Sequence, residues 1–162
     1  MLDQELLREL QEYIEKHSEQ PEYGYALYAP TGPAIVTEAL DTELENYIKN
    51  NRKPTFNQLL FSLIDKKGAR DSDVYKKAGI DRRHFSKIRN PDYRPGKNTV
   101  IALALALELN KKETGELLAA AGYSLSESST SDLVILFFLE KKIYDIDTVN
   151  QALHYFSLKP LV

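Results

Sequence analysis

The sequence predicts an all-α protein, and three observations lead to this fold class. Apolar residues recur at spacings of three and four along most segments, as they do on the buried side of a helix. Gly, Pro and Asn separate these segments at positions suited to helix ends. The one strict alternation, the leucines from Leu103 to Leu109, has mainly alanine between them, and Ala and Leu are the strongest helix formers. A helix that is apolar on every side is a buried helix, so we expect this segment in the core.

The composition of the chain excludes several kinds of site and any membrane-spanning segment. The chain has 162 residues and no cysteine, which excludes disulfides, thiolate metal sites and a cysteine nucleophile. Its longest apolar run, Leu133 to Leu139, is far too short to cross a bilayer. The N-terminus lacks the basic-then-apolar pattern of a signal peptide. We therefore expect a cytoplasmic protein with no membrane contact.

Residues 1–53 are predicted to form an acidic helical arm. A helix is expected over Asp3–His17, and Pro, Gly and Tyr then interrupt the pattern from residue 20 to 36, which predicts a loop. A second helix is expected over Thr37–Lys49. Its apolar stripe consists of Leu40, Leu44, Tyr47 and Ile48.

The next segment, residues 54–122, contains two short helices flanking Gly79. A preceding helix opens with a capping box of Thr55 and Gln58 and ends at Gly68. Gly79 suits the left-handed backbone that follows a helix C-terminus, and Asp81 suits the N-cap of the next helix. On that helix only Phe85 and Ile88 are apolar, which leaves a cationic outer side.

This stretch resembles the lambda repressor-like (XRE-type) helix-turn-helix family. The family's motif carries Gly at the turn, as Gly79 does here, and apolar residues at the places of Val74, Ile80, Phe85 and Ile88. The family's following helix is matched by Thr99–Leu109. The resemblance covers roughly residues 55–120. One departure is Tyr75, which stands where the family usually has Ala close to the recognition helix, and which implies a wider helix crossing or a different use of the scaffold.

The resemblance implies sequence-specific binding to double-stranded DNA, as in a transcriptional regulator. The charge distribution agrees, because residues 50–100 carry thirteen basic and five acidic side chains whereas residues 1–49 carry three and eleven. Arginine offers the paired donors that guanine accepts in the major groove. The resemblance assigns base contacts to Arg82, Arg83, Ser86 and Lys87. It assigns backbone contacts to Lys76, Lys77, Arg94, Lys97, Asn98 and Thr99.

Residues 123–162 are predicted to form a C-terminal helical extension. The helix expected over Asp132–Lys142 is apolar on every face, so it forms either a junction with the preceding domain or a two-fold homodimer contact, together with Tyr144 and Tyr155. A last helix is expected after Asp147 as its cap.

Nothing in the sequence indicates catalysis, a metal or a cofactor. The three histidines, His17, His84 and His154, lie on different predicted helices without ligand spacing. The alternative to DNA binding is a non-enzymatic interaction module, in which the basic face docks an acidic protein, RNA or the protein's own acidic arm.

Overall fold

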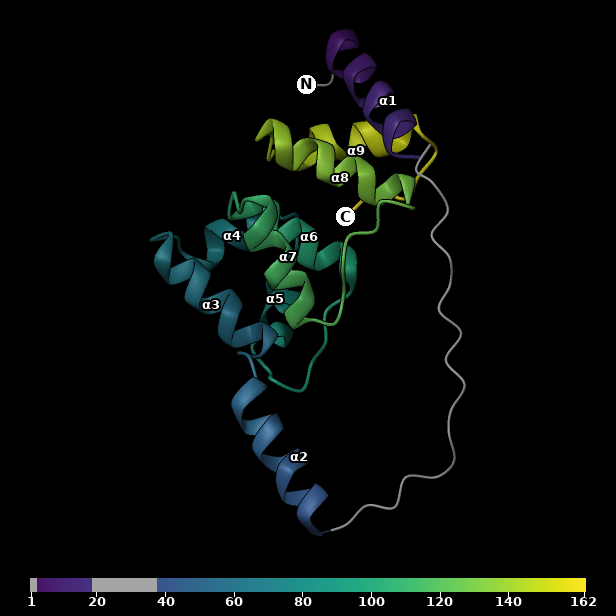
Figure 1. Ribbon diagram of the computed structural model, residues 1–162. Coiled ribbons are helices and arrows are strands. Elements are labelled where there is room, and N and C mark those ends of the chain that lie inside the picture. The colour runs from purple at the N-terminus through teal and green to yellow at the C-terminus, as the bar shows by residue number, and fades with distance from the viewer. Residues whose placement is uncertain (1–2, 19–37) are drawn as a thin grey trace. The chain divides into compact units, whose positions relative to one another are not determined.

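Every regular element that the computed structural model describes is an α-helix (Figure 1). The described residues are 3–18 and 38–162, and the loop predicted from residue 20 to 36 lies outside them. The all-α prediction is confirmed for the described ranges. None of the helices in these ranges is long and apolar enough to span a membrane. The helices are α1 (Gln4–Ser18), α2 (Glu38–Asn51), α3 (Phe56–Lys66), α4 (Asp71–Lys77), α5 (Arg82–Ile88), α6 (Lys97–Ala106), α7 (Lys111–Ala120), α8 (Thr130–Lys141) and α9 (Ile146–Tyr155).

The described residues fall into two compact units. One contains α1 together with residues 55–162, and the other contains residues 38–54 with α2. The predicted acidic arm, residues 1–53, is therefore divided between the two units. The predicted helix at α2 is present, but its apolar stripe is exposed: Leu44 is 52% accessible and Tyr47 65%.

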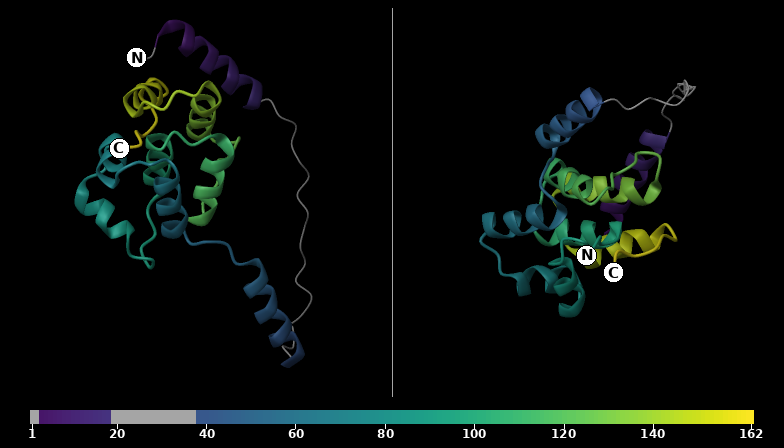
Figure 2. Two further views of the ribbon diagram at one scale, coloured as in Figure 1. Left: turned by 90° about the vertical axis from the view of Figure 1, so that its left-hand side faces the viewer. Right: turned by 90° about the horizontal axis from the view of Figure 1, so that it is seen from below.

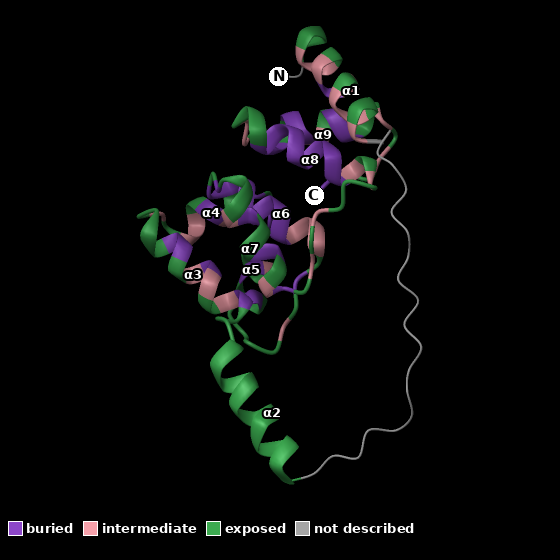
Figure 3. Ribbon diagram, viewed as in Figure 1, coloured by how far each residue is buried: buried purple, intermediate pink, exposed green. Residues whose placement is uncertain are grey.

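Helix α6 is the buried centre of the larger unit. Every residue from Val100 to Ala106 is buried, which confirms the prediction for this alanine- and leucine-rich segment (Figure 3). Helices α4, α7 and α9 pack on it from different sides. The helix begins at Lys97, earlier than the Thr99 expected from the resemblance, and it ends before Glu108, whose φ of 54° is left-handed.

Helix α8 is covered by its own chain. All residues from Leu133 to Leu139 are buried, and α1, α7 and α9 pack around them. In both figures α8 and α9 lie between α1 and the group of helices from α3 to α7 (Figures 1 and 2). This burial is what we expected if the helix forms a junction with the preceding helices of the same chain. Of the two tyrosines expected to take part, Tyr144 is half-buried and Tyr155 is 49% exposed, and the homodimer contact stays a prediction.

Helix α1 is held on α8 by apolar and polar contacts. Leu10 is fully buried, and Tyr13 packs its ring edge-on against Phe137 at 5.8 Å between centroids. Lys141 forms an ion pair with Glu9. The Tyr13 hydroxyl donates to Glu140 at 3.4 Å, and burial together with this carboxylate raises the pKa of Tyr13 to about 12. The N-terminal helix is thus part of the folded unit.

The last helix is capped by Asp145, and the prediction of Asp147 as its cap is wrong. The Asp145 carboxylate accepts from the amide and the hydroxyl of Thr148, at 3.1 and 2.6 Å. Asp147 instead occupies the first turn, where its charge still favours the helix N-terminus. After α9 the chain turns back, and the amide of Leu161 donates to the side chain of Asn150.

The C-terminal residue Val162 reaches the turn between α4 and α5. Gly79 in this turn has a φ of +71°, and a Cβ added to it would lie 2.9 Å from Cγ2 of Val162. The left-handed backbone selects glycine here, whereas the contact with the half-exposed side chain of Val162 could be relieved by a shift of that side chain. Gly68 follows the end of α3, as predicted, and Gly122 follows the end of α7, and both also have positive φ.

We expect Gly79→Ala to lower the free energy of unfolding by at least about 1–2 kcal/mol, the cost of a left-handed residue with a side chain. Gly115→Ala is the matched control, because Gly115 is exposed within α7 and a Cβ there meets nothing within 4 Å. This control should stabilise the protein by up to about 1 kcal/mol. Urea denaturation of both variants is the measurement. Equal effects of the two substitutions would contradict the assignment of the turn.

Candidate functional site

Helices α4 and α5 are joined by a short turn around Gly79. Val74, Ala78 and Ile80 are buried beneath it. Asp81 forms the N-cap of α5, as predicted, by accepting from the backbone amides of His84 and Arg83. These amides hold the pKa of Asp81 below its usual value, so the cap is ionised at neutral pH and is lost as pH falls through that lowered pKa.

Burial divides α5 into two sides. Phe85 and Ile88 point inward and are buried, as their spacing predicted. Four residues form the opposite side, which we call the outer face of α5. They are Arg82, Arg83, Ser86 and Lys87, and all are exposed.

The four side chains of the outer face are arranged as two stripes along the helix. The Ser86 hydroxyl donates to the carbonyl of Arg82 at 3.0 Å, so its proton is engaged while its oxygen still accepts. Arg83 and Lys87 are four residues apart and share one stripe of the helix, whereas Arg82 and Ser86 share the next. Neither the Arg83 nor the Lys87 side chain has an ion-pair partner among residues 3–18 and 38–162. Two cations on one stripe are therefore available to a ligand.

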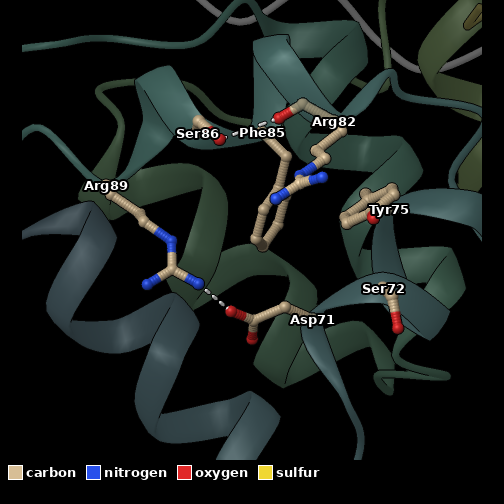
Figure 4. A pocket seen from close by; sticks show the side chains of 7 residues that line it. All are labelled: Asp71, Ser72, Tyr75, Arg82, Phe85, Ser86 and Arg89. Carbon is tan, nitrogen blue, oxygen red and sulfur yellow. Dashed lines mark hydrogen bonds and ion pairs between the residues drawn. The ribbon is translucent and has the colours of Figure 1, made fainter.

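A cleft of about 350 Å³ lies between α4 and α5 on the flank of the outer face (Figure 4). We call it the α4–α5 cleft. Tyr75 is half-buried in its wall and lies 5.4 Å from Phe85 between ring centroids, at an angle of 45°. The residues that line it are Asp71, Ser72 and Tyr75 from α4, Arg82, Phe85 and Ser86 from α5, and Arg89 from the end of α5.

Arg89 closes one end of the α4–α5 cleft. Its guanidinium forms an ion pair with Asp71 and lies 5.3 Å from the centroid of the Phe61 ring. The amide side chain of Asn57 donates to its carbonyl at 3.3 Å. Arg89 thus joins α5 to α3 and α4, and it neutralises an acidic side chain beside the outer face.

The residues predicted to contact a DNA backbone are placed in different ways. Lys76 and Lys77 are exposed at the C-terminal end of α4, and Asn98 and Thr99 are half-buried in the first turn of α6. Arg94 is exposed, but its guanidinium contacts the protein itself, since Nε donates to the carbonyl of Ala121 at 2.7 Å. Its guanidinium also lies 4.4 Å from the centroid of the Tyr123 ring. Arg94 therefore closes the C-terminal end of α7.

Lys97 also forms its contact within the protein, as an ion pair. Its Nζ lies 2.7 Å from Oδ2 of Asp132, whose side chain is only 7% exposed. The same oxygen accepts from the amide of Ser126 at 2.8 Å. The pair fastens the start of α6 to α8, so this cation balances a buried carboxylate.

Sequence reasoning did not identify the α4–α5 cleft or the role of Arg89. The only signal was Tyr75, a large ring at a position where the resembled family has a small residue. An ion pair such as Arg89–Asp71, between residues 18 positions apart, has no local sequence pattern. Its existence follows from how α4 and α5 pack.

No family model matches the chain, and neither a curated protein nor a solved structure matches it. The geometry of residues 3–18 and 38–162 therefore carries the functional argument. Within these ranges no group of three or more metal-ligating side chains is present.

We expect Lys97→Met to lower the free energy of unfolding by about 1–3 kcal/mol, because it removes a charged hydrogen bond from a buried carboxylate. Methionine keeps an unbranched side chain and removes the ammonium group, with both its charge and its hydrogen-bond donors. Lys112→Met, at an exposed site on α7, is the control and should have little effect. Urea denaturation at neutral pH measures both. An unchanged stability of Lys97→Met would show that the cation is free for an external ligand.

Proposed function

We propose that the protein binds double-stranded DNA through the outer face of α5, as a transcriptional regulator. The observation that carries this proposal is the division of α5 by burial. Its two apolar residues are buried, and its three cationic residues other than the terminal Arg89 are left together on the exposed side. A short helix anchored from below and cationic above is suited to enter a major groove.

The surrounding helices support this proposal. Helix α4, the turn at Gly79 and α5 have the order of a helix-turn-helix, and α4 rests on the buried helix α6. We infer that α3 to α7 form a domain of the lambda repressor-like kind, with α1, α8 and α9 as additions. In such a domain the second helix of the motif is the recognition helix.

The chemistry of the outer face suits base recognition. Arg82 and Arg83 each offer the paired N–H donors that match O6 and N7 of guanine. Ser86 can accept from a base amino group, and Lys87 adds a point charge. Lys76 and Lys77 are exposed on the neighbouring helix and suit phosphate contacts. Pairing of Asp71 with Arg89 removes one negative charge that would repel phosphate.

The proposal predicts that the double variant Arg83→Ala, Lys87→Ala loses affinity for duplex DNA. Each lost contact should cost about 1–3 kcal/mol at a preferred site, and both cations contribute to the salt dependence. The preferred site is first selected from a pool of random duplexes. Fluorescence anisotropy at low and physiological salt then compares the variant with the parent, and parental affinity should weaken steeply with salt.

The matched control is Lys112→Ala, which removes an exposed cation from α7 in the same folded unit. It should leave DNA affinity and its salt dependence close to the parental values. An Arg83, Lys87 variant that binds as tightly as the parent would refute the role of the outer face. Absence of salt-dependent binding by the parent itself would favour the alternative, in which the basic face docks an acidic protein or RNA.

A further inference from the structure

The α4–α5 cleft exists because an aromatic ring stands between the two helices. Tyr75 contacts Phe85 across the interface, and Phe85 in turn meets Phe61 of α3 at 6.0 Å between centroids, edge to face. Phe85 is 2% exposed, whereas Tyr75 is half-buried and keeps part of its ring surface in the cleft. The ring holds α4 and α5 apart, and the resulting space opens beside Arg82.

The lining of the cleft defines the chemistry of its ligand. An aromatic surface from Tyr75 lies at one side, and the planar guanidinium of Arg82 lies at the same mouth (Figure 4). At the rim the hydroxyl of Ser72 can donate or accept, whereas the hydroxyl of Ser86, which donates to the carbonyl of Arg82, can accept. Because Asp71 is paired with Arg89, the guanidinium of Arg82 is the one charge in this lining without an ion-pair partner.

These features together exclude several ligands. A cationic side chain would meet two guanidinium groups, and an aliphatic chain would desolvate the guanidinium and the hydroxyls without replacing their hydrogen bonds. A free anion would use Arg82 but not the ring. A planar heterocycle linked to a phosphate uses the Tyr75 ring, the Arg82 guanidinium and the serine hydroxyls together. It stacks on the ring and on the guanidinium, and its edge meets the hydroxyls.

We propose that the α4–α5 cleft receives one unpaired nucleobase of the nucleic acid that lies across α5. A space of about 350 Å³ is in the range of pockets that hold small ligands, and it can take a single base. A base inside a duplex has both faces covered by its neighbours, so only a bulged, mismatched or extruded base can enter. The inference rests on the proposed function, since the strand reaches the cleft from the outer face of α5.

Arg82 connects the binding of a strand on the outer face of α5 with the binding of a base in the α4–α5 cleft. It belongs both to the outer face and to the lining of the cleft, so a strand that contacts the outer face beside Arg83 and Lys87 passes the mouth where Arg82 and Tyr75 stand. The preferred ligand is then a duplex that carries an unpaired base, and not a perfectly paired one.

The test uses two fluorescent duplexes of the same sequence. In one, the adenine analogue 2-aminopurine is an extra, unpaired nucleotide, and in the other it is paired with thymine. The full-length protein should bind the bulged duplex about tenfold more tightly, in keeping with one stacked base, and should quench the fluorescence of the unpaired analogue on binding.

Two variants test the role of the ring. Tyr75→Phe keeps the aromatic face and should retain both the preference and the quenching, whereas Tyr75→Leu removes the ring that lies beside a bound base and holds α4 and α5 apart, and it should lose both. Tyr75→Leu should bind the paired duplex as the parent does. Circular dichroism and urea denaturation establish that each variant is folded. Should the leucine variant fail to fold, Arg82→Lys, at an exposed position, replaces it and should also reduce the preference for the bulge.

The outcomes separate this inference from the proposed function. Equal affinity of the parent for the two duplexes, or a preference that persists in Tyr75→Leu, would overturn the nucleobase cleft and leave duplex binding by α5 in place. Absence of salt-dependent binding to either duplex would overturn the proposed function, and the inference would fall with it.

Discussion

Complete burial of α6 is the constraint on which the larger unit depends. A helix that is apolar on every side needs cover on every side, and no single neighbouring helix can supply it. Helices α4, α7 and α9 each take part of this surface, so elements distant in the sequence are brought to one centre. The position of α4, and with it that of α5, is set by this requirement. The outer face of α5 is therefore displayed by a rigid core.

Hydrogen bonds and an ion pair add to the apolar packing in fixing how the helices are arranged. The Lys97–Asp132 pair joins the start of α6 to α8, and Arg94 joins the chain before α6 to the end of α7. The hydroxyl of Tyr123 donates to the carbonyl of Pro95 at 2.9 Å in the same region. Such contacts are directional, and they fix the segment between α5 and α6 where apolar packing alone would allow it to slide. They also commit two cations, Arg94 and Lys97, to contacts within the protein.

The interface between α4 and α5 contains both a packed aromatic cluster and the α4–α5 cleft. Phe85 is buried among Tyr75 and Phe61, and edge-on and tilted ring contacts of this kind add to the stabilisation that burial provides. Because Tyr75 is large, it also leaves part of its ring accessible in the α4–α5 cleft. A single side chain thus serves the packing of two helices and shapes the surface beside the outer face.

Local patterns in the sequence determined where helices form, several of their caps and the inward side of α5, although the cap of α9 is Asp145 and was not predicted. The Thr55–Gln58 capping box, the glycine ends at Gly68 and Gly79 and the buried pair Phe85 and Ile88 depend on neighbours within a few residues, so spacing and side-chain chemistry suffice to predict them. The outward positions of Arg82, Arg83, Ser86 and Lys87 follow from the same periodicity.

Only the tertiary structure decided which cations remain available and where a cleft opens. Lys97 and Arg94 look like any surface cation in the sequence, and their partners Asp132 and Ala121 lie 35 and 27 residues away. The docking of α1 on α8 likewise joins distant segments, since Tyr13 and its partner Glu140 are 127 positions apart. Charge and exposure at such positions depend on long-range packing, which no local spacing encodes, and the α4–α5 cleft depends on the distance at which Tyr75 holds two helices apart.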